Sequence, residues 1–465
     1  MRPVPLLSII VLIGLAGCTV GPDYVRPSAP MSATFKEAEG WTKAMPADAV
    51  DRGDWWNLFN DPMLDKLERH VEVSNQNLAA AEAAYRQARA LVREQRAAYF
   101  PTVSLGGSGQ GAKTPGVAAA GNYKVDIGAT WEPDVWGSIR RTVEGGRASA
   151  QASAADLATA KLSAQGELAA NYLQLREADA EAALLTATVD AYARSLEITQ
   201  NRYAVRIAAK SDVLLAQTQL ANARASLTTL TQQRAQLEHA IAVLTGQAPG
   251  DFSLAVAPQW SQQTPEIPVG LPSTLLQRRP DIAAAERRVA AANAQIGVAE
   301  AAFFPTFSLT GSVGDQASQL LQLFSSQTSL WSLGITVAET VFDGGARRAR
   351  TDQAKAAYDQ TVAQYRQVTL AALQGVEDQL AATRILAQRA ALLAEASRAA
   401  DEAEQISLNQ YKARLVDYST VVIAQASALS ARQSLAQSIR DRQTTAVALI
   451  QALGGSFHAD AAPSE

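Results

Sequence analysis

The sequence predicts an α+β membrane protein, in which a tandem repeat supplies four transmembrane β-strands and long antiparallel coiled-coil helices. Three observations lead to this fold class. Segments recur about 200 residues apart, which is the signature of an internal repeat. Strict alternation of polar and apolar residues marks the strands, and an apolar seam repeats every seven residues in long stretches without proline.

The repeat is visible in two pairs of segments that match in register. They are AAYFPTVSL at 97–105 with AAFFPTFSL at 301–309, and NRYAVRIAAKSDVLLAQ at 201–217 with NQYKARLVDYSTVVIAQ at 409–425. The offset grows slightly between the two pairs, which indicates small insertions in loops. We therefore expect a first structural repeat over residues 54–250, a linker over 251–280 and a second repeat over 281–455.

Each repeat is predicted to open with a helix that ends before a Phe-Pro pair. Ser74 is a suitable N-cap for the first helix, and Pro280 suits the first turn of the second. Pro101 and Pro305 cannot continue a helix, and they bias the preceding residue towards extended backbone. The repeated junction is thus a switch from helix to strand, used once in each repeat.

Two strands are predicted after each switch. Apolar and polar side chains alternate strictly from Tyr123 to Glu132 and again from Trp331 to Ala338, and a weaker alternating stretch precedes each of them. About ten residues of alternation suit a membrane strand with one face towards lipid. A soluble hairpin with one buried face would give the same periodicity.

Long helices are predicted to complete each repeat. The glycine pairs at residues 145–146 and 344–345 are expected to mark the turn from strand to helix. Residues 147–203 contain no proline, and their apolar seam has coiled-coil spacing, as does that of the return helix. Polar interruptions such as Arg234 and Arg442 suggest that another face of these helices meets water.

Four strands cannot close a membrane barrel by themselves. Single-chain bacterial barrels start at about eight strands, and an open sheet edge in lipid leaves polar groups unsatisfied at a cost of several kcal/mol each. The membrane interpretation therefore requires oligomerisation. Three chains would give twelve strands above a closed barrel of helices, and the two repeats would act as pseudo-equivalent units around the ring.

The N-terminus, MRPVPLLSIIVLIGLAGC, resembles a bacterial lipoprotein signal. A basic residue precedes an apolar stretch that suits a signal peptide and is too short to span a bilayer. We expect residues 1–17 to be removed and Cys18 to carry acyl chains, at the start of a lipidated extended segment over 18–53. A free thiol after an ordinary signal peptide is the alternative. Thr19, rather than Asp, resembles signals that favour the outer membrane.

Composition excludes several other classes of function. The formal net charge of −4 argues against a nucleic-acid partner, which usually calls for a basic face. The three histidines, His70, His239 and His458, lie far apart and have no ligand spacing. Without a P-loop, a nucleophile elbow or a metal-ligand cluster, we expect no enzyme activity and no cofactor other than the lipid on Cys18.

Motifs spread over nearly the whole chain resemble one known family. They are CTVGPDYVRP (18–27), DWWNLFNDPMLDKL (54–67), LPSTLLQRRPDIAAAE (271–286), AAFFPTFSLTGS (301–312) and ALGG (452–455). The chain resembles the outer membrane factors of the TolC type, in the OprM-like and NodT-like lipoprotein branch of tripartite efflux systems.

This resemblance implies a homotrimer with a 12-stranded β-barrel in the outer membrane and a long periplasmic α-barrel. It implies an equatorial belt that includes the linker over 251–280, with the C-terminal tail over 456–465. It also implies a passive exit channel for small toxic compounds and drugs. The partners would be outer-membrane lipid, a periplasmic adaptor and an inner-membrane transporter of the RND type.

The resemblance also implies gating at the periplasmic tips, where each long helix turns back near 204–210 and 412–417. Tyr411 matches a tyrosine that related channels carry there, and Tyr203 is its repeat mate. Ile423 and Ala426 stand where OprM-like members carry an Asp and an Arg. The sequence therefore does not support an acid–base gate at those two positions.

Two arginines give the tips a further feature. Arg206 and Arg414 stand where relatives often have Gly, and Asp212 and Asp417 lie close by in sequence. We expect these four side chains to form a charged ring that holds the tip closed or receives the adaptor. The alternative is a solvated turn surface, because exposed ion pairs contribute only about 0–1 kcal/mol.

Two other functions fit parts of the sequence. One is a duct for type I polypeptide secretion, and the other is a periplasmic coiled-coil lipoprotein without a pore. The lipoprotein signal and the RRPDI motif favour drug efflux over polypeptide secretion. The alternating strands argue against a scaffold, and an enzyme has the least support because no catalytic constellation is present.

Overall fold

The computed structural model describes residues 19–30, 32, 34–37, 54–113, 115–116, 120–265, 267, 279–325 and 328–455. The chain divides into two compact units. The first, here called the sheet unit, comprises residues 1–29, 83–154 and 284–367. The second, the hairpin unit, comprises residues 30–82, 155–283 and 368–465.

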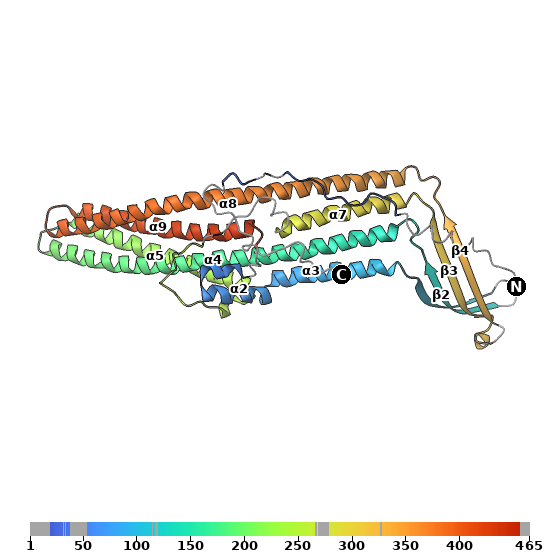
Figure 1. Cartoon of the computed structure of the whole chain (residues 1–465). Coiled ribbons are helices and arrows are strands. Elements are labelled where there is room, and N and C mark those ends of the chain that lie inside the picture. The colour runs from blue at the N-terminus through green and yellow to red at the C-terminus, as the bar shows by residue number, and fades with distance from the viewer. Residues whose placement is uncertain are drawn as a thin grey trace. The chain divides into compact units, whose positions relative to one another are not determined.

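The order of elements repeats along the chain (Figure 1). The first set is η2 (Trp55–Phe59), α2 (Pro62–Ser74), α3 (Gln76–Ala97), β1 (Thr102–Ala112), β2 (Ala120–Trp131), α4 (Ser138–Ala204), α5 (Lys210–Leu244) and η3 (Pro249–Asp251). The second is α7 (Pro280–Ala301), β3 (Thr306–Ala317), η5 (Leu320–Gln322), β4 (Ser329–Ala338), α8 (Ala346–Lys412) and α9 (Tyr418–Ala452). Helices α4 and α8 both have 67 residues, and α5 and α9 both have 35. The repeat bounds predicted from sequence stay predictions, but the paired lengths agree with a duplication.

The short helices end where the Phe-Pro pairs were predicted to stop them. Helix α3 ends at Ala97 and α7 at Ala301, and each is followed by a strand. The predicted cap of α3 was wrong, however. Asn75 caps this helix, because its Oδ1 accepts hydrogen bonds from the backbone N–H groups of Asn77 and Leu78, at 2.9 and 3.1 Å. Ser74 instead ends α2, a helix that the sequence analysis did not predict.

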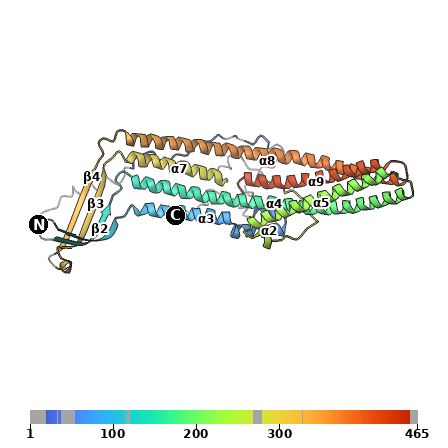
Figure 2. The same cartoon turned by 180° about the vertical axis from the view of Figure 1, so that it is seen from behind.

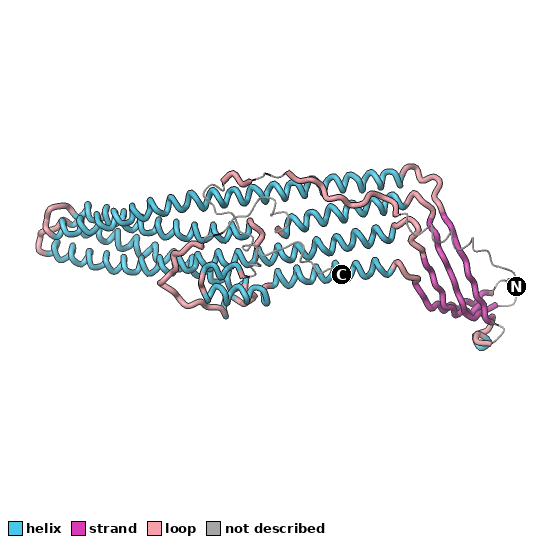
Figure 3. Tube along the Cα trace, viewed as in Figure 1, coloured by secondary structure: helices cyan, strands magenta, loops and turns pink. Residues whose placement is uncertain are grey.

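The four strands form one antiparallel sheet in the order β1-β2-β3-β4 (Figure 3). The pairing of β2 with β3 joins the two repeats, with Trp131 opposite Leu309. Large apolar side chains on one face of β4 are exposed, among them Trp331 and Leu333. The sheet therefore offers an apolar surface together with two edge strands, β1 and β4, that each have one neighbour in the described chain.

The turn from strand to helix differs between the repeats. In the second repeat the glycine pair at 344–345 does precede α8, and Gly344 has a φ of 63°. In the first repeat the prediction was wrong, because α4 already begins at Ser138 and the left-handed residue is Gly137, with a φ of 84°. The pair at 145–146 lies inside α4, where side chains would press against α3 and α7.

The apolar seam predicted for the long helices forms the core of the hairpin unit. Leu168 and Leu175 on α4 are fully buried. Further along, Leu185 on α4 packs with Leu230 on α5, and Tyr192 packs with Leu220. Helix α5 accordingly runs back beside α4, and α9 runs back beside α8 (Figures 1 and 2).

Two features are absent from the described residues. None of their helices combines the length and the apolar character needed to cross a membrane. None of their His, Cys, Asp and Glu side chains form a group of three that could hold a metal ion.

Candidate functional site

The turns at the ends of the two hairpins have the same backbone design. Arg206 and Arg414 adopt left-handed backbone, with φ of 61° and 64°. In each tip the residue after the arginine donates a backbone hydrogen bond to the carbonyl four residues before the arginine. These bonds are Ile207 to Arg202 at 2.8 Å and Leu415 to Gln410 at 2.9 Å. This pattern ends many helices, and it usually places Gly at the left-handed position. The arginines therefore occupy a conformation that costs a residue with a Cβ about 1–2 kcal/mol.

The four side chains of the predicted charged ring all lie in or beside these turns. Asp212 is in the first turn of α5, and Asp417 precedes α9, although its side chain accepts no capping hydrogen bond. Ion pairs in the described parts of α8 and α9 join other residues, and none of the described ion pairs joins two of the four ring residues. The charged ring thus stays a prediction about the assembled protein.

The two tip tyrosines have different surroundings. Tyr203 of the first hairpin is 46% exposed, whereas Tyr411 of the second is only 7% exposed. The ring of Tyr411 lies 5.1 Å from that of Tyr418, centroid to centroid, and both pack with Ala216 of α5 and Val421 of α9. The second tip is therefore the better packed of the two, and its cluster includes a residue of the first hairpin.

Arg202 connects the two tips, and the sequence analysis missed it. Its guanidinium lies 4.4 Å from the centroid of the Tyr411 ring, and its Nη1 donates a hydrogen bond to the Tyr411 carbonyl at 3.1 Å. A cation over an aromatic face contributes about 0.5–2 kcal/mol. A signal was present, because the repeat mate of Arg202 is Gln410 in otherwise similar segments.

The remaining positions predicted from the sequence give less support for a functional site. Ile423 and Ala426 are exposed on α9, and neither side chain can ionise. Cys18 lies outside the described residues, as does the tail over 456–465. The structure therefore does not test lipidation, although it describes the segment that follows the cysteine.

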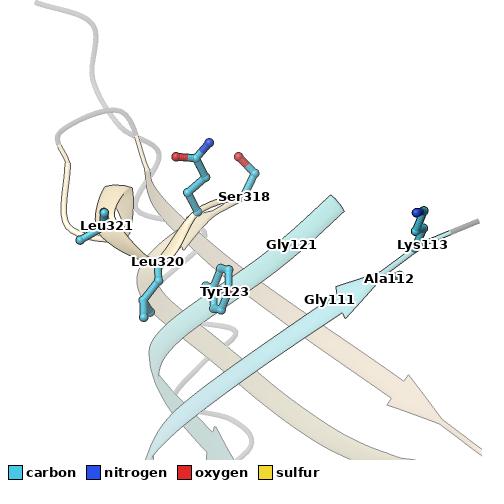
Figure 4. A pocket seen from close by; sticks show the side chains of 9 residues that line it. Gly111, Ala112, Lys113, Gly121, Tyr123, Ser318, Leu320 and Leu321 are labelled. Carbon is cyan, nitrogen blue, oxygen red and sulfur yellow. The ribbon is translucent and has the colours of Figure 1, made fainter. Parts of the chain in front are cut away.

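A pocket at one end of the sheet is not a catalytic centre. Figure 4 shows Tyr123 of β2 facing the connection between β3 and β4, where Leu320 and Leu321 lie. Among the described lining residues, Lys113 is the one charged side chain. The other described lining residues are uncharged and include no histidine or carboxylate to form an acid–base pair with this lysine.

Comparison with known proteins gives consistent matches over almost the whole chain. The family described as outer membrane efflux protein matches residues 69–247 and 271–455. The probable efflux pump outer membrane protein TtgC of Pseudomonas putida is 30% identical over 455 residues, covering 96% of this chain and 94% of the relative. The outer membrane protein OprJ of Pseudomonas aeruginosa is 29% identical, covering 97% and 95%.

Solved structures agree with these matches. The outer-membrane channel OprN superimposes with a TM-score of 0.88 at 32% identity, covering 94% of this chain and 99% of that one. The open state of the MtrE outer membrane channel of Neisseria gonorrhoeae gives a TM-score of 0.85 at 29% identity, covering 94% and 98%. The fold of the chain is therefore that of outer-membrane channels.

Proposed function

Because this chain belongs to the outer membrane efflux protein family and is an outer-membrane efflux channel of a pump system, we propose that three copies form a passive duct gated at the helix tips. Members of this family are channels rather than enzymes, and their location is the outer membrane. The energy for export comes from the rest of the pump. The duct itself has to open and to reseal.

The trimer is supported by the strand count and the two edges of the sheet. One chain contributes four strands, with β1 and β4 at the edges. Exposed edges in lipid would leave each unpaired polar group at a cost of several kcal/mol. Pairing β4 of one copy with β1 of the next satisfies them, and three copies give a barrel of twelve strands, within the range of bacterial outer-membrane barrels. The long helices would then form a periplasmic α-barrel.

The proposed cargo is small toxic compounds. Relatives in Pseudomonas putida are named for the efflux of antibiotics, of toluene and of solvents. As an efflux pump component, the chain works with an adaptor and an inner-membrane transporter, and we assign the transporter to the RND type. Acyl chains on Cys18 would anchor each copy to outer-membrane lipid.

The contact between Arg202 and Tyr411 carries the gating proposal. It joins the α4–α5 tip to the α8–α9 tip within one chain by a single charged side chain. A contact of about 1–2 kcal/mol can hold a closed arrangement and still yield to an adaptor that binds the open one more tightly. Arg206, Arg414, Asp212 and Asp417 would lie beside it, in the surface that meets the adaptor.

Single-channel recording in lipid bilayers tests the gate. Replacing Arg202 with Gln, the residue at the equivalent position of the other hairpin, removes both contacts without creating a cavity. We expect the open probability without adaptor to rise about tenfold, since 1.4 kcal/mol corresponds to a factor of ten. Gln410→Arg is the matched control, because it changes the mate of Arg202 at an exposed position, and it should leave the open probability unchanged.

Native mass spectrometry of the same samples tests the assembly. A trimer with an acyl mass on each N-terminus supports the duct, whereas a stable monomer in mild detergent contradicts it. If Arg202→Gln remains trimeric and its open probability equals that of the unmodified protein, the tip contact is not the gate.

A further inference from the structure

The chain that follows Cys18 is held against α7 and the start of α4 in the sheet unit. Residues 19–29, here called the strap, lie beside α7 (Figure 1). The backbone N–H of Val20 donates to the carbonyl of Trp136 at 3.1 Å, and the side chain of Asn293 donates to the carbonyl of Pro22 at 2.9 Å. The hydroxyl of Tyr24 donates to the carboxylate of Glu286. The strap is therefore bonded both to the start of α4 and to α7.

Arg141 on α4 is the centre of this binding. Its side chain is only 4% exposed. Its Nε donates to the carbonyl of Val20 at 3.2 Å, and its Nη2 donates to the carbonyl of Gly21 at 3.1 Å and to Asp23 at 2.9 Å. One further partner, Glu144, comes from α4 itself. A buried guanidinium is costly unless it is paired and hydrogen-bonded, and most of the partners of this one come from the strap.

Close contacts at two glycines show that the strap fits tightly against α7 and the turn before α4. Gly21 has a φ of 94°, and a Cβ there would lie 2.4 Å from the Cα of Gly297 on α7. Gly137 has a φ of 84°, and a Cβ there would lie 2.6 Å from the Thr19 side chain. Larger residues at either glycine would force the strap out, so the fit depends on glycine both in the strap and in the turn before α4.

The described part of the second repeat shows no such arrangement, although its helix begins in a similar way. The carboxylate of Asp134 binds the backbone N–H and Nε of Arg140, at 2.8 and 3.2 Å. That of Asp343 binds the same two groups of Arg347, at 3.1 and 2.8 Å. By this correspondence the mate of Arg141 is Arg348.

Arg348 shows what the arginine does without a strap. It is exposed, and no hydrogen bond or ion pair to it is found in the described chain. The start of the helix therefore does not by itself bury the second arginine of the pair. Burial of the first arginine results from the strap together with α7, whose Gly297 lies directly against the Arg141 side chain.

We propose that Arg141 is a positioning residue that fixes the acylated N-terminus beside the start of β3, so that the lipid anchor is rigidly coupled to the strands. This inference rests on the proposed acylation of Cys18. Only Thr19 stands between Cys18 and Val20, and extended chain spans at most about 3.6 Å per residue. The anchor must therefore lie within about 7 Å of the bond between Val20 and Trp136.

Trp136, which accepts the hydrogen bond from Val20, is itself held in place by two contacts. Its indole N–H donates to the carbonyl of Pro305 at 2.7 Å, and its ring stacks on Phe304 at 4.8 Å. The strap is thus bonded to a residue that is itself fixed to the start of β3. An anchor held there places the acyl chains beside the strands instead of trailing on a loose tether.

Protease release of the anchor tests the seating of the strap. The full-length protein is made with its own signal and treated in detergent with chymotrypsin, and the peptide 18–24, cut after Tyr24, is followed by mass spectrometry. We expect Arg141→Met to release this peptide at least tenfold faster than the unmodified protein, and Arg141→Lys to be intermediate because it keeps the charge. Arg348→Met is the matched control and should not change the rate.

The dependence on lipid separates positioning from simple structural support. The amount of protein in the outer-membrane fraction is measured for Arg141→Met with Cys18 present. It is measured again with Cys18→Ala behind a leader that an ordinary signal peptidase removes. We expect the arginine substitution to lower the amount only when Cys18 is present. An equal loss in both backgrounds would overturn the proposal, as would a release rate equal to that of Arg348→Met.

Two further results complete the test. If Arg141→Met does not fold, Gly21→Ala changes the strap alone, and it should accelerate release in the same way because of the collision with Gly297. A released peptide with no acyl mass would overturn the lipidation of Cys18 and this inference with it. An acylated peptide released at an unchanged rate would overturn this inference alone.

Discussion

The two helical hairpins hold the same kind of ion pair in opposite surroundings. In the first hairpin Asp179 on α4 lies 2.7 Å from Arg234 on α5, and the two side chains are 0% and 17% exposed. In the second, Asp401 on α8 lies 2.7 Å from Arg432 on α9, and the side chains are 43% and 31% exposed. Equal distances with unequal burial show that the two ion pairs differ in what covers them.

The cover of the first pair is the linker that follows α5. Arg234 donates to the carbonyl of Leu254 at 2.7 Å, and Asp179 accepts the backbone N–H of Ala257 at 3.0 Å. Asp179 also pairs with Arg176. In α8 and α9, which are described throughout, every buried polar side chain is uncharged. The first hairpin therefore uses buried charges to bind a covering segment, and the second keeps its charges in water.

The largest effect should come from breaking the buried pair. We expect Asp179→Ala to lower the free energy of unfolding by about 3–5 kcal/mol, because two arginines lose their partner away from water. Asp401→Ala removes the exposed pair and should cost at most about 1 kcal/mol. Urea unfolding of the purified protein in detergent measures both, and equal losses would show that burial does not distinguish the hairpins.

A second comparison uses pH, because Glu68 is another buried ionisable group of the first repeat. It lies on the apolar face of α2, fully buried, and neither carboxyl oxygen has a hydrogen-bond partner among the described residues. Burial, with a smaller contribution from Glu72, raises the pKa of Glu68 to about 9. The folded protein therefore holds a proton that the unfolded chain releases above its ordinary pKa of about 4.5.

The sign of the pH effect follows from this proton. Stability should fall as pH rises from about 4.5 to about 9, by up to about 1.4 kcal/mol per pH unit. Glu68→Gln cannot ionise, so it should remove this slope and be the more stable protein at pH 8. Thermal unfolding between pH 5 and 9 measures the difference. Glu72→Gln, on the same helix, should keep the slope, and a slope retained by Glu68→Gln would contradict the assignment.

Local periodicity explains what could be predicted from sequence. The alternation from Tyr123 and the heptads through Leu168 are properties of short stretches, and the strands and helical seams lie where they indicated. The errors arose where one residue pattern serves two purposes. A glycine pair marks a turn before α8 but a close helix contact inside α4, and Ser74 resembles a cap although α2 extends through it.

Contacts between distant parts of the chain account for the rest. Arg234 was expected on a face that meets water, which was wrong, because the linker and Asp179 enclose its charged end. Arg202 meets Tyr411 across 209 residues, and Arg141 meets Gly21 across 120. None of these pairs shares a helix turn or a strand, so no local period could indicate them.

The smallest effect should be the same in both hairpins. Arg206→Gly and Arg414→Gly each replace a left-handed arginine by the residue that this conformation favours, and each should stabilise its tip by about 1 kcal/mol. Hydrogen exchange of the two turns measures the gain. If the predicted charged ring acts in gating or in adaptor binding, the double variant should also change single-channel conductance or pump-dependent resistance. Unchanged values of both would leave the arginines as solvated turn residues, and the difference between the hairpins would then rest on burial alone.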